Sequence, residues 1–281
     1  MSLQDTNYTY NFSGKNLSFD RPRVMGILNV SPDSFFDGGR YSDEEGMLSR
    51  TEKMLLEGAD IIDIGAYSTR PGATDISEAE ELNRLIPALK ALRKNYPDTL
   101  ISIDSFRSFV AKCAVEEGAD IVNDISGGTI DALMFDRVTD LKAGYILTHI
   151  KGHPSTMQEK PSYKNVVEEV GNFFTAQLAK LKPQENVQVF LDPGFGFGKT
   201  IEHNFQLLKS LAHFKHFGLP LLVGLSRKSM ISKSLGITAD EALNGTTALH
   251  SLALLNGADI LRVHDVKEAM ECIQLIQLYG R

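Results

Sequence analysis

Four polar side chains stand at or just past the ends of apolar runs in this chain: Asp104, Asn123, Asp192 and Lys228. Carboxylates and ammonium groups are costly to bury unless something pairs with them. The carboxylates, the amide and the ammonium group could satisfy one another. They could also bind a flat heterocycle, because a carboxylate accepts two adjacent N–H groups while a lysine donates to ring acceptors. Their origin in separate segments of the chain favours the heterocycle.

A second group of polar side chains is typical of an anion site. Arg262 and His264 stand two residues apart at the end of the last apolar run, so the period of a strand places both on one face. Asn29 ends the first run, which neighbours the last one if the strands close into a barrel. The amide oxygen of Asn29 suits Mg²⁺ that is held mainly by substrate phosphates and water. An asparagine alone is usually a strand-end cap, so the metal prediction depends on its neighbours.

Two other motifs lack residues that their usual chemistry requires. The segment 193–200 ends in Gly-Lys-Thr like a nucleotide-binding loop, but Pro193 stands where that motif needs its first glycine. Tight turns that allow Phe197 to present its ring to a flat ligand explain these glycines better. His149 and His153 have the spacing of zinc ligands on a helix, yet a glycine and a proline beside them argue against a helix, and further ligands are not evident.

The elements that must position these residues follow from the alternation of apolar runs with helical periodicity. The runs predict strands at 24–29, 61–65, 100–104, 121–124, 145–149, 189–192, 221–226 and 260–265. The intervening patterns predict helices at about 43–57, 77–94, 108–117, 131–142, 164–182, 202–217, 239–256 and 266–279. Strand followed by helix, repeated eight times, predicts an α/β fold: a parallel (β/α)8 TIM barrel, whose active site lies at the carboxyl ends of the strands.

Three further features concern the frame of the barrel. Residues 8–19 alternate apolar and polar, which predicts an N-terminal β-hairpin that plugs the amino-terminal mouth. The triplet Gly-Ala-Asp follows three predicted helices, where the glycine would serve as a left-handed helix stop; it recurs at 58–60, 118–120 and 257–259. Long loops at 31–41 and 66–76 are expected to act as lids. The length predicts a single domain over residues 1–281.

Composition excludes several classes of protein. A net charge of −7 leaves no basic face for nucleic acid, and the 42% hydrophobic and 23% charged contents are ordinary for a globular chain. No apolar stretch approaches the roughly 20 residues that cross a bilayer, and residues 1–20 lack the apolar core of a secretion signal. Cys113 and Cys272 fall in predicted helices and are expected to be reduced. We therefore expect a cytoplasmic protein without a membrane partner.

Five motifs in a fixed order resemble the dihydropteroate synthase family. They are Gly-Ile-Leu-Asn-Val-Ser-Pro-Asp-Ser-Phe at 26–35, Ser-Thr-Arg-Pro-Gly at 68–72, Asp-Pro-Gly-Phe-Gly-Phe-Gly-Lys at 192–199, Gly-Leu-Ser-Arg-Lys-Ser at 224–229 and Arg-Val-His-Asp-Val at 262–266. The resemblance runs from about Arg23 to the C-terminus. It implies condensation of 6-hydroxymethyl-7,8-dihydropterin pyrophosphate with p-aminobenzoate, giving 7,8-dihydropteroate and pyrophosphate in folate biosynthesis. It also implies a Mg²⁺ cofactor, a homodimer and inhibition by sulfonamides.

The resemblance also implies roles for individual residues. The family's pterin pocket falls on Asp104, Asn123, Asp192 and Lys228, and its pyrophosphate site on Asn29, Arg262 and His264, with Asn29 at the metal. Its p-aminobenzoate site falls on Asp33, Phe35, Thr69, Arg70, Pro71, Phe197 and Ser229. The catalytic group implied is Asp104, Lys228, Arg262 and His264. The chain departs from the family at Ala66-Tyr67, where Gly-Glu is usual, and at Thr148, where Met is common.

Two other functions are compatible with a pterin-binding barrel. A pterin-dependent methyltransferase would bind a corrinoid partner and lack the Ser-Thr-Arg-Pro motif, which this chain has at 68–71. A non-catalytic pterin-binding paralogue would have lost Arg70, Lys228 or the pair formed by Arg262 and His264, and all four are present. The synthase is the function that the sequence favours.

Overall fold

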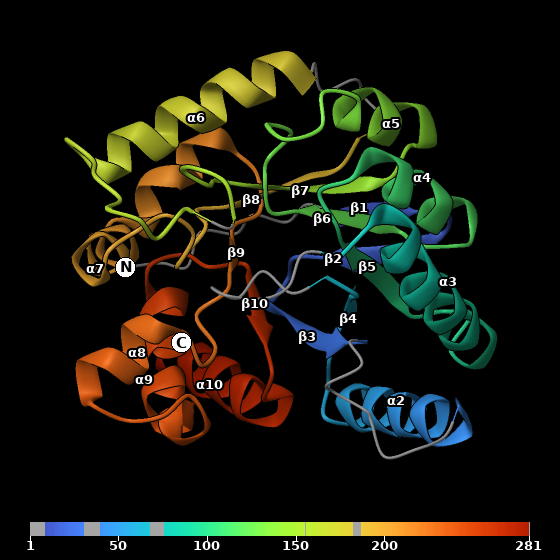
Figure 1. Ribbon diagram of the computed structural model, residues 1–281. Helices are drawn as coiled ribbons and strands as arrows, with labels where there is room; N and C mark the ends of the chain where they lie inside the picture. Colours follow the sequence, from blue (N-terminus) through green and yellow to red (C-terminus); the bar gives the residue numbers. More distant parts are fainter. Residues whose placement is uncertain (1–8, 31–39, 68–75, 155, 182–186, 281) are drawn as a thin grey trace.

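The computed structural model describes residues 9–30, 40–67, 76–154, 156–181 and 187–280, and the strands in these segments form a parallel barrel (Figure 1). The barrel strands are β3 (Arg23–Asn29), β4 (Ile61–Gly65), β5 (Leu100–Asp104), β6 (Ile121–Asp124), β7 (Gly144–Thr148), β8 (Val189–Asp192), β9 (Leu222–Val223) and β10 (Ile260–Val263). They pair in the order β8-β7-β6-β5-β4-β3-β10-β9, and a parallel bridge between Leu191 and Leu221 joins the two ends. The predicted eight-stranded barrel is confirmed.

Helices surround the barrel (Figure 1). They are α2 (Arg40–Leu56), α3 (Glu78–Asn95), α4 (Ser108–Glu116), α5 (Met134–Leu141), α6 (Val166–Leu181), α7 (Ile201–Lys209), α8 (Ser229–Leu235), α9 (Leu243–Leu255) and α10 (Val266–Tyr279), with 3-10 helices η1 (Leu211–Phe217) and η2 (Asp240–Ala242). The predicted helix at 202–217 was wrong as one element. The backbone tightens at Ser210, whose carbonyl accepts the N–H of His213 at 2.9 Å, and the second part is a 3-10 helix.

The segment after the seventh barrel strand also differs from the prediction. Strand pairing stops at Val223, because the chain turns so that the Lys228 N–H bonds the Leu225 carbonyl at 3.2 Å. Arg227 adopts a left-handed conformation (φ 54°), and its N–H bonds the Thr246 hydroxyl at 3.1 Å instead of a neighbouring strand. The short helix α8 then begins at Ser229 and was not predicted.

The N-terminal hairpin closes the mouth of the barrel at the amino ends of the strands, as predicted. This end is called the lower end, and the carboxyl ends of the strands form the upper end. Strands β1 (Thr9–Phe12) and β2 (Lys15–Ser18) pair antiparallel. Phe12, Leu17 and Phe19 from this segment are buried in one cluster with an interior residue from every barrel strand: Met25, Ile61, Leu100, Ile121, Ile146, Phe190, Leu222 and Ile260. The rings of Phe12 and Phe190 stack with centroids 6.3 Å apart. This end of the interior is therefore apolar and filled.

The interior becomes polar two residues farther along alternate strands. Successive inward-facing residues of a strand are two apart, so the positions above Ile61, Ile121, Phe190 and Ile260 are Asp63, Asn123, Asp192 and Arg262. These four residues come from β4, β6, β8 and β10. TIM-barrel interiors consist of such layers, each contributed by alternate strands. One polar layer therefore lies directly above an apolar one.

The Gly-Ala-Asp repeat fixes the lower ends of the strands. Its glycines have φ values of 103°, 102° and 92°, as expected for left-handed helix stops. Asp60 donates its N–H to the Val24 carbonyl at 2.8 Å and accepts the Val24 N–H on its carboxylate at 2.9 Å. Asp120 makes the same pair of bonds with Ile101, and Asp259 makes it with Leu221. The aspartate of each repeat thus holds a preceding strand in register.

The helices and the cysteines bear on the predictions from composition. Across these segments, no helix combines the length and apolar character that crossing a membrane requires. Cys113 on α4 is half-buried and Cys272 on α10 is buried, and both are free thiols. That residues 1–281 form a single domain stays a prediction.

Candidate active site

A cluster of charged side chains spans the polar layer at the upper end of the barrel. The Arg262 guanidinium lies between two carboxylates, with Nε 2.7 Å from Asp63 Oδ2 and Nη2 2.7 Å from Asp104 Oδ2. Asn123 Nδ2 also donates to Asp63 Oδ2, at 3.1 Å. Asp63 is fully buried, and its Oδ1 has no hydrogen-bond partner within the described part of the chain. Two carboxylates therefore share one guanidinium, and one carboxylate oxygen is left unmatched.

Asp63 was missed by the sequence analysis although it joins Arg262 to Asn123. Its strand is otherwise apolar, so the sequence pattern marks it only as part of a core run. The signal that could have found it is the two-residue period: Asp63 faces the same way as Ile61, which lies in the apolar interior layer.

The electrostatics of this cluster favour a proton on Asp104. Burial raises the pKa of Asp104 to about 7; the charge of Arg262 opposes that shift, and the charge of Asp63 adds to it. One guanidinium balances only one of the two carboxylates, so protonation of Asp104 is favoured as pH falls to neutrality.

Asp192 and Lys228 form a second pair of oppositely charged groups. Asp192, at the end of β8, is buried and accepts the Gly194 N–H at 2.7 Å. Burial raises the pKa of Asp192, and the nearby charge of Lys228 opposes that shift. Burial lowers the pKa of Lys228 to about 8, opposed by Asp192. The Lys228 ammonium donates to the Phe195 carbonyl and lies 4.8 Å from the centre of the Phe197 ring.

The rim between β9 and β10 carries His264. Its Nδ1 lies 3.0 Å from the Ser226 hydroxyl oxygen, which also accepts the His264 backbone N–H at 3.2 Å. A hydroxyl that accepts this N–H can donate its own hydrogen to Nδ1, which leaves the ring proton on Nε2. The Arg227 guanidinium on the same rim forms a bidentate pair with Asp265 at 2.8 and 2.9 Å.

Asn29 lies at the upper end of β3, where its side chain is exposed. A side chain at Gly65 on the next strand would meet Asn29 Oδ1 and the Asp104 Cβ, each at 3.6 Å. The absence of that side chain leaves space between an amide oxygen and a carboxylate. Hard oxygen ligands of this kind suit Mg²⁺.

The glycine-rich loop after β8 is fixed by a buried lysine. Lys199 Nζ lies 2.8 Å from His149 Nδ1 and donates to the carbonyls of Gly194 (2.8 Å), Phe197 (3.1 Å) and His149 (3.3 Å). Burial lowers the pKa of Lys199 well below its usual value. Burial also lowers the pKa of His149, and the nearby charge of Lys199 lowers it further. Lys199 faces the protein interior, so this loop is not a phosphate-binding one.

Within the described residues, no group of three or more His, Cys, Asp and Glu could hold a metal.

The predicted p-aminobenzoate residues are only partly described. Phe197 is half-buried beside Lys228, and Ser229 is exposed as the first residue of α8. The remaining five predicted residues lie outside the described residues: Asp33, Phe35, Thr69, Arg70 and Pro71. Most of the two loops predicted to be lids lies outside them as well.

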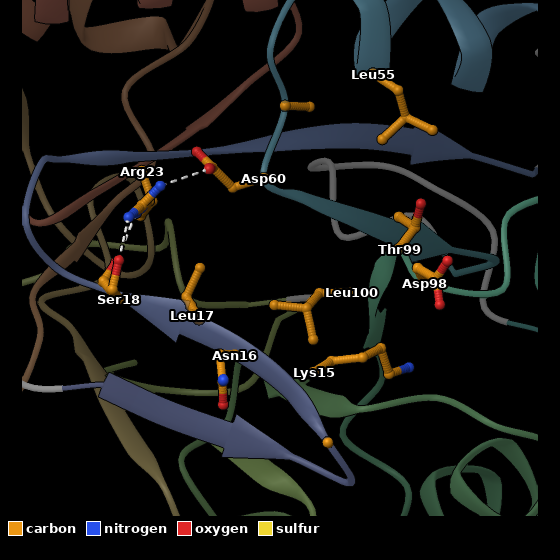
Figure 2. Close-up of a pocket in the computed structure, with 12 residues that line it drawn as sticks. Lys15, Asn16, Leu17, Ser18, Arg23, Leu55, Asp60, Asp98, Thr99 and Leu100 are labelled. Carbon is orange, nitrogen blue, oxygen red and sulfur yellow. Dashed lines mark hydrogen bonds and ion pairs between the residues drawn. The ribbon is translucent and has the colours of Figure 1, made fainter.

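A hollow of about 550 Å³ opens at the opposite end of the barrel, beside the hairpin (Figure 2). Figure 2 shows Arg23 between Ser18 and Asp60, with Nη1 3.0 Å from Asp60 Oδ1. Lys15 on the same rim pairs with Asp120 at 2.5 Å. These cations already have carboxylate partners, so the hollow lacks the unmatched polar groups of the upper end.

Comparisons with known proteins identify the family. The sequence profile described as "Pterin binding enzyme" matches residues 25–264. The dihydropteroate synthase of Escherichia coli (strain K12) is 42% identical over 270 residues, which cover 94% of each chain.

Solved structures agree. The Yersinia pestis dihydropteroate synthase with a sulfonamide drug complex superposes with a TM-score of 0.89 at 38% identity, covering 97% of this chain and 98% of that one. The Xanthomonas albilineans dihydropteroate synthase with 4-aminobenzoic acid gives a TM-score of 0.89 at 37% identity, with the same coverage. The chain therefore belongs to the dihydropteroate synthase family and is a pterin-binding transferase of folate synthesis.

Proposed function

We propose that the polar upper interior of the barrel binds 6-hydroxymethyl-7,8-dihydropterin pyrophosphate and transfers its pterinylmethyl group to p-aminobenzoate. The observation that carries this assignment is the polar layer itself. Asp63 of this layer and Asp104 of the layer above share the single Arg262 guanidinium, and Asp63 Oδ1 is buried without a partner in the described segments. Buried polar groups in native proteins are nearly always hydrogen-bonded, so unmatched groups in one layer point to a polar ligand.

The pterin ring is recognised from several strands at once. Asp192 accepts two adjacent N–H groups of the ring, Asn123 adds an amide, and Lys228 donates to a ring acceptor. Asp104 lies close enough to share Arg262 with Asp63 and contributes a further carboxylate. Positive charge that develops on the ring is stabilised by these carboxylates.

The pyrophosphate group is bound by Arg262, His264 and Asn29 above the pterin. Two bonds to carboxylates leave further N–H donors on the Arg262 guanidinium, which has five in all. His264 presents its Nε2 proton, because Ser226 fixes Nδ1. Asn29 would supply an oxygen ligand to Mg²⁺. Held there, Mg²⁺ would supply charge that stabilises the leaving group.

The reaction is a substitution at the pterin methylene carbon. The bond from this carbon to the pyrophosphate oxygen breaks, and pyrophosphate leaves with the electron pair. The amine nitrogen of p-aminobenzoate forms the new bond and then loses one proton to solvent. An aryl amine that attacks an electron-poor carbon needs no strong base, and the motifs contain no evident pair of nucleophile and base.

The p-aminobenzoate ring occupies the rim formed by Phe197 and Ser229. Loop residues that the family resemblance implies complete this part of the site: Asp33, Phe35, Thr69, Arg70 and Pro71. The Xanthomonas albilineans relative, solved with 4-aminobenzoic acid, supports this assignment, and the Yersinia pestis relative supports sulfonamides as competitors.

A kinetic assay tests the proposed function. Pyrophosphate release is followed with dihydropterin pyrophosphate and Mg²⁺, with and without p-aminobenzoate. Release that depends on p-aminobenzoate, with dihydropteroate formed in equal amount, supports the synthase. Release at the same rate without p-aminobenzoate, or none at all, would contradict it.

The homodimer forms through the two C-terminal helices. Exposed apolar side chains gather on α9 and α10, which pack against each other: Leu252, Leu255, Leu275, Leu278 and Tyr279. An apolar surface of this kind is typical of a protein interface. Sedimentation should give a dimer for the native chain and a monomer for the double variant Leu275→Glu, Leu278→Glu. Leu56→Glu, which changes an exposed leucine at the end of α2, is the matched control and should stay dimeric. A cytoplasmic location stays part of the proposal.

A further inference from the structure

Thr148 occupies the upper end of β7, at the interior of the barrel. It stands in register with Asp192 on β8. Ile146, two residues earlier, lies in the apolar interior cluster, so the period of the strand directs Thr148 to the interior as well. By the alternation of strands, Thr148 shares a layer with Asp104 on β5, directly above the layer of Asp63, Asn123, Asp192 and Arg262.

The hydroxyl of Thr148 has no hydrogen-bond partner in the described part of the chain, although the residue is only 1% exposed. Two other threonines are equally buried and do have partners. Thr51 Oγ1 donates to the Met47 carbonyl at 2.9 Å, and Thr246 Oγ1 accepts the Arg227 N–H at 3.1 Å. Burial alone therefore does not explain the unmatched hydroxyl at Thr148.

The groups around this hydroxyl already face the proposed pterin pocket. Asp192 is its neighbour in register, and the Lys228 ammonium would lie 3.6 Å from the Cβ of a side chain at Gly224, near the upper end of β9. Asp63 Oδ1 in the layer below is also unmatched. An unpaired hydroxyl in register with a buried carboxylate is suited to the polar edge of a heterocycle, since a hydroxyl both donates and accepts.

We propose that Thr148 is a pterin-binding residue whose hydroxyl hydrogen bonds the polar edge of the ring beside Asp192. This inference rests on the proposed function and adds one contact to it. The family commonly has an apolar methionine at this position, so the hydroxyl makes the pocket of this chain more polar. Affinity for the pterin should then depend on the Thr148 hydroxyl, which a single substitution removes.

Three variants separate a ligand-binding role from a structural one. Thr148→Val keeps the shape and removes the hydroxyl, Thr148→Ser keeps the hydroxyl, and Thr51→Val removes an equally buried hydroxyl that is already bonded. The probe is 6-hydroxymethylpterin, titrated calorimetrically in the presence of Mg²⁺ and pyrophosphate. Thermal unfolding without ligand and the KM for p-aminobenzoate are measured alongside.

Thr148→Val should weaken pterin binding about tenfold, the effect of one hydrogen bond of ordinary strength left unmade on the ligand. Thr148→Ser should stay within about twofold of the native protein. Without ligand, Thr148→Val should unfold at the same or a higher temperature, because an unpaired buried hydroxyl is lost. Thr51→Val should unfold at a lower temperature with unchanged affinity.

The outcomes distinguish this inference from the proposed function. If the native protein binds 6-hydroxymethylpterin and Thr148→Val binds it equally well, the role of Thr148 is overturned and the synthase assignment stands. A lower unfolding temperature of Thr148→Val with unchanged affinity would also overturn it, in favour of a structural role. If the native protein neither binds the pterin nor releases pyrophosphate, the proposed function itself fails.

Discussion

At the lower end of the barrel each aspartate of the Gly-Ala-Asp repeat has its own donors, whereas at the upper end several carboxylates share too few. Asp120 accepts the Ile101 N–H at 2.9 Å and pairs with Arg93 at 2.8 Å and Lys15 at 2.5 Å. Asp63 and Asp104 share Arg262. The same residue types thus stabilise the fold at one end and hold unmatched hydrogen-bonding capacity at the other.

The difference teaches how one barrel separates stability from chemistry. Paired charges at the lower end fix strand register beneath an apolar plug. Unpaired polar atoms at the upper end lower stability, and a ligand that pairs with them gains binding energy. Functional sites are where a protein leaves polar groups without hydrogen-bond partners of its own.

The largest expected effect is on stability, at the lower end. Asp120→Ala leaves the partly buried Arg93 and Lys15 without a carboxylate and frees the Ile101 N–H. Breaking a buried charge pair by removing one partner costs about 3–5 kcal/mol. Urea denaturation should show this loss, with turnover per folded molecule unchanged. Asp98→Ala, an exposed residue on the same rim, should change stability by less than about 0.5 kcal/mol. Equal effects of the two variants would contradict the comparison.

At the upper end, a comparable change should act on catalysis. Arg262→Ala and His264→Ala should lower kcat by about a hundredfold or more, because charge on departing pyrophosphate develops in the transition state. Pterin affinity should fall less, since the ground state gains less from these groups. Steady-state kinetics and calorimetry on each variant measure the two quantities. Normal kcat with only a raised KM for the pyrophosphate substrate would remove these residues from the leaving-group site.

A third variant separates the loop from the pterin layer. Lys199→Met keeps the apolar stem but removes the ammonium group that holds three carbonyls and the His149 ring. Phe197 should then be less fixed, so the KM for p-aminobenzoate should rise about tenfold, the effect of one or two lost hydrogen bonds. Pterin affinity should change by less than about threefold. A larger loss of pterin affinity than of p-aminobenzoate affinity would contradict this division.

Local patterns were sufficient to predict the frame of the molecule. Apolar runs and helical periods are properties of neighbouring residues, so the barrel strands, the hairpin and the glycine stops followed from sequence. Asp104, Asn123, Asp192 and Arg262 were also found, because polar residues at strand ends are conspicuous. The short helix α8 and the break at Ser210 were missed, since one or two turns carry too little periodicity.

Contacts between distant segments could not be predicted in the same way. Asp63 binds Arg262, which is 199 residues away in sequence, and Lys199 binds His149, which is 50 residues away. Both contacts depend on barrel closure and strand register. The Gly-Ala-Asp repeat was recognised, but the backbone bonds of its aspartates depend on which strand lies beside each one.

A further expected effect is a pH dependence of stability at the upper end. Burial raises the pKa of Asp104 from its ordinary value of 3.8 to about 7. The folded protein then holds a proton that the unfolded chain has lost, so stability from this group is present below pH 3.8 and is lost as pH rises to about 7. Asp104→Asn should remove this part of the decline, as urea denaturation across that range would show. An identical decline in the variant would assign it to other groups.

The most direct test of the upper end as the ligand site is calorimetric titration of 6-hydroxymethylpterin into Asp192→Asn. An amide offers one acceptor and one misplaced donor where the carboxylate accepts two N–H groups, so about 1.5–3 kcal/mol of binding energy should be lost. That loss is a tenfold to hundredfold weaker affinity. Unchanged affinity, or a loss matched by Asp120→Ala at the lower end, would contradict the account.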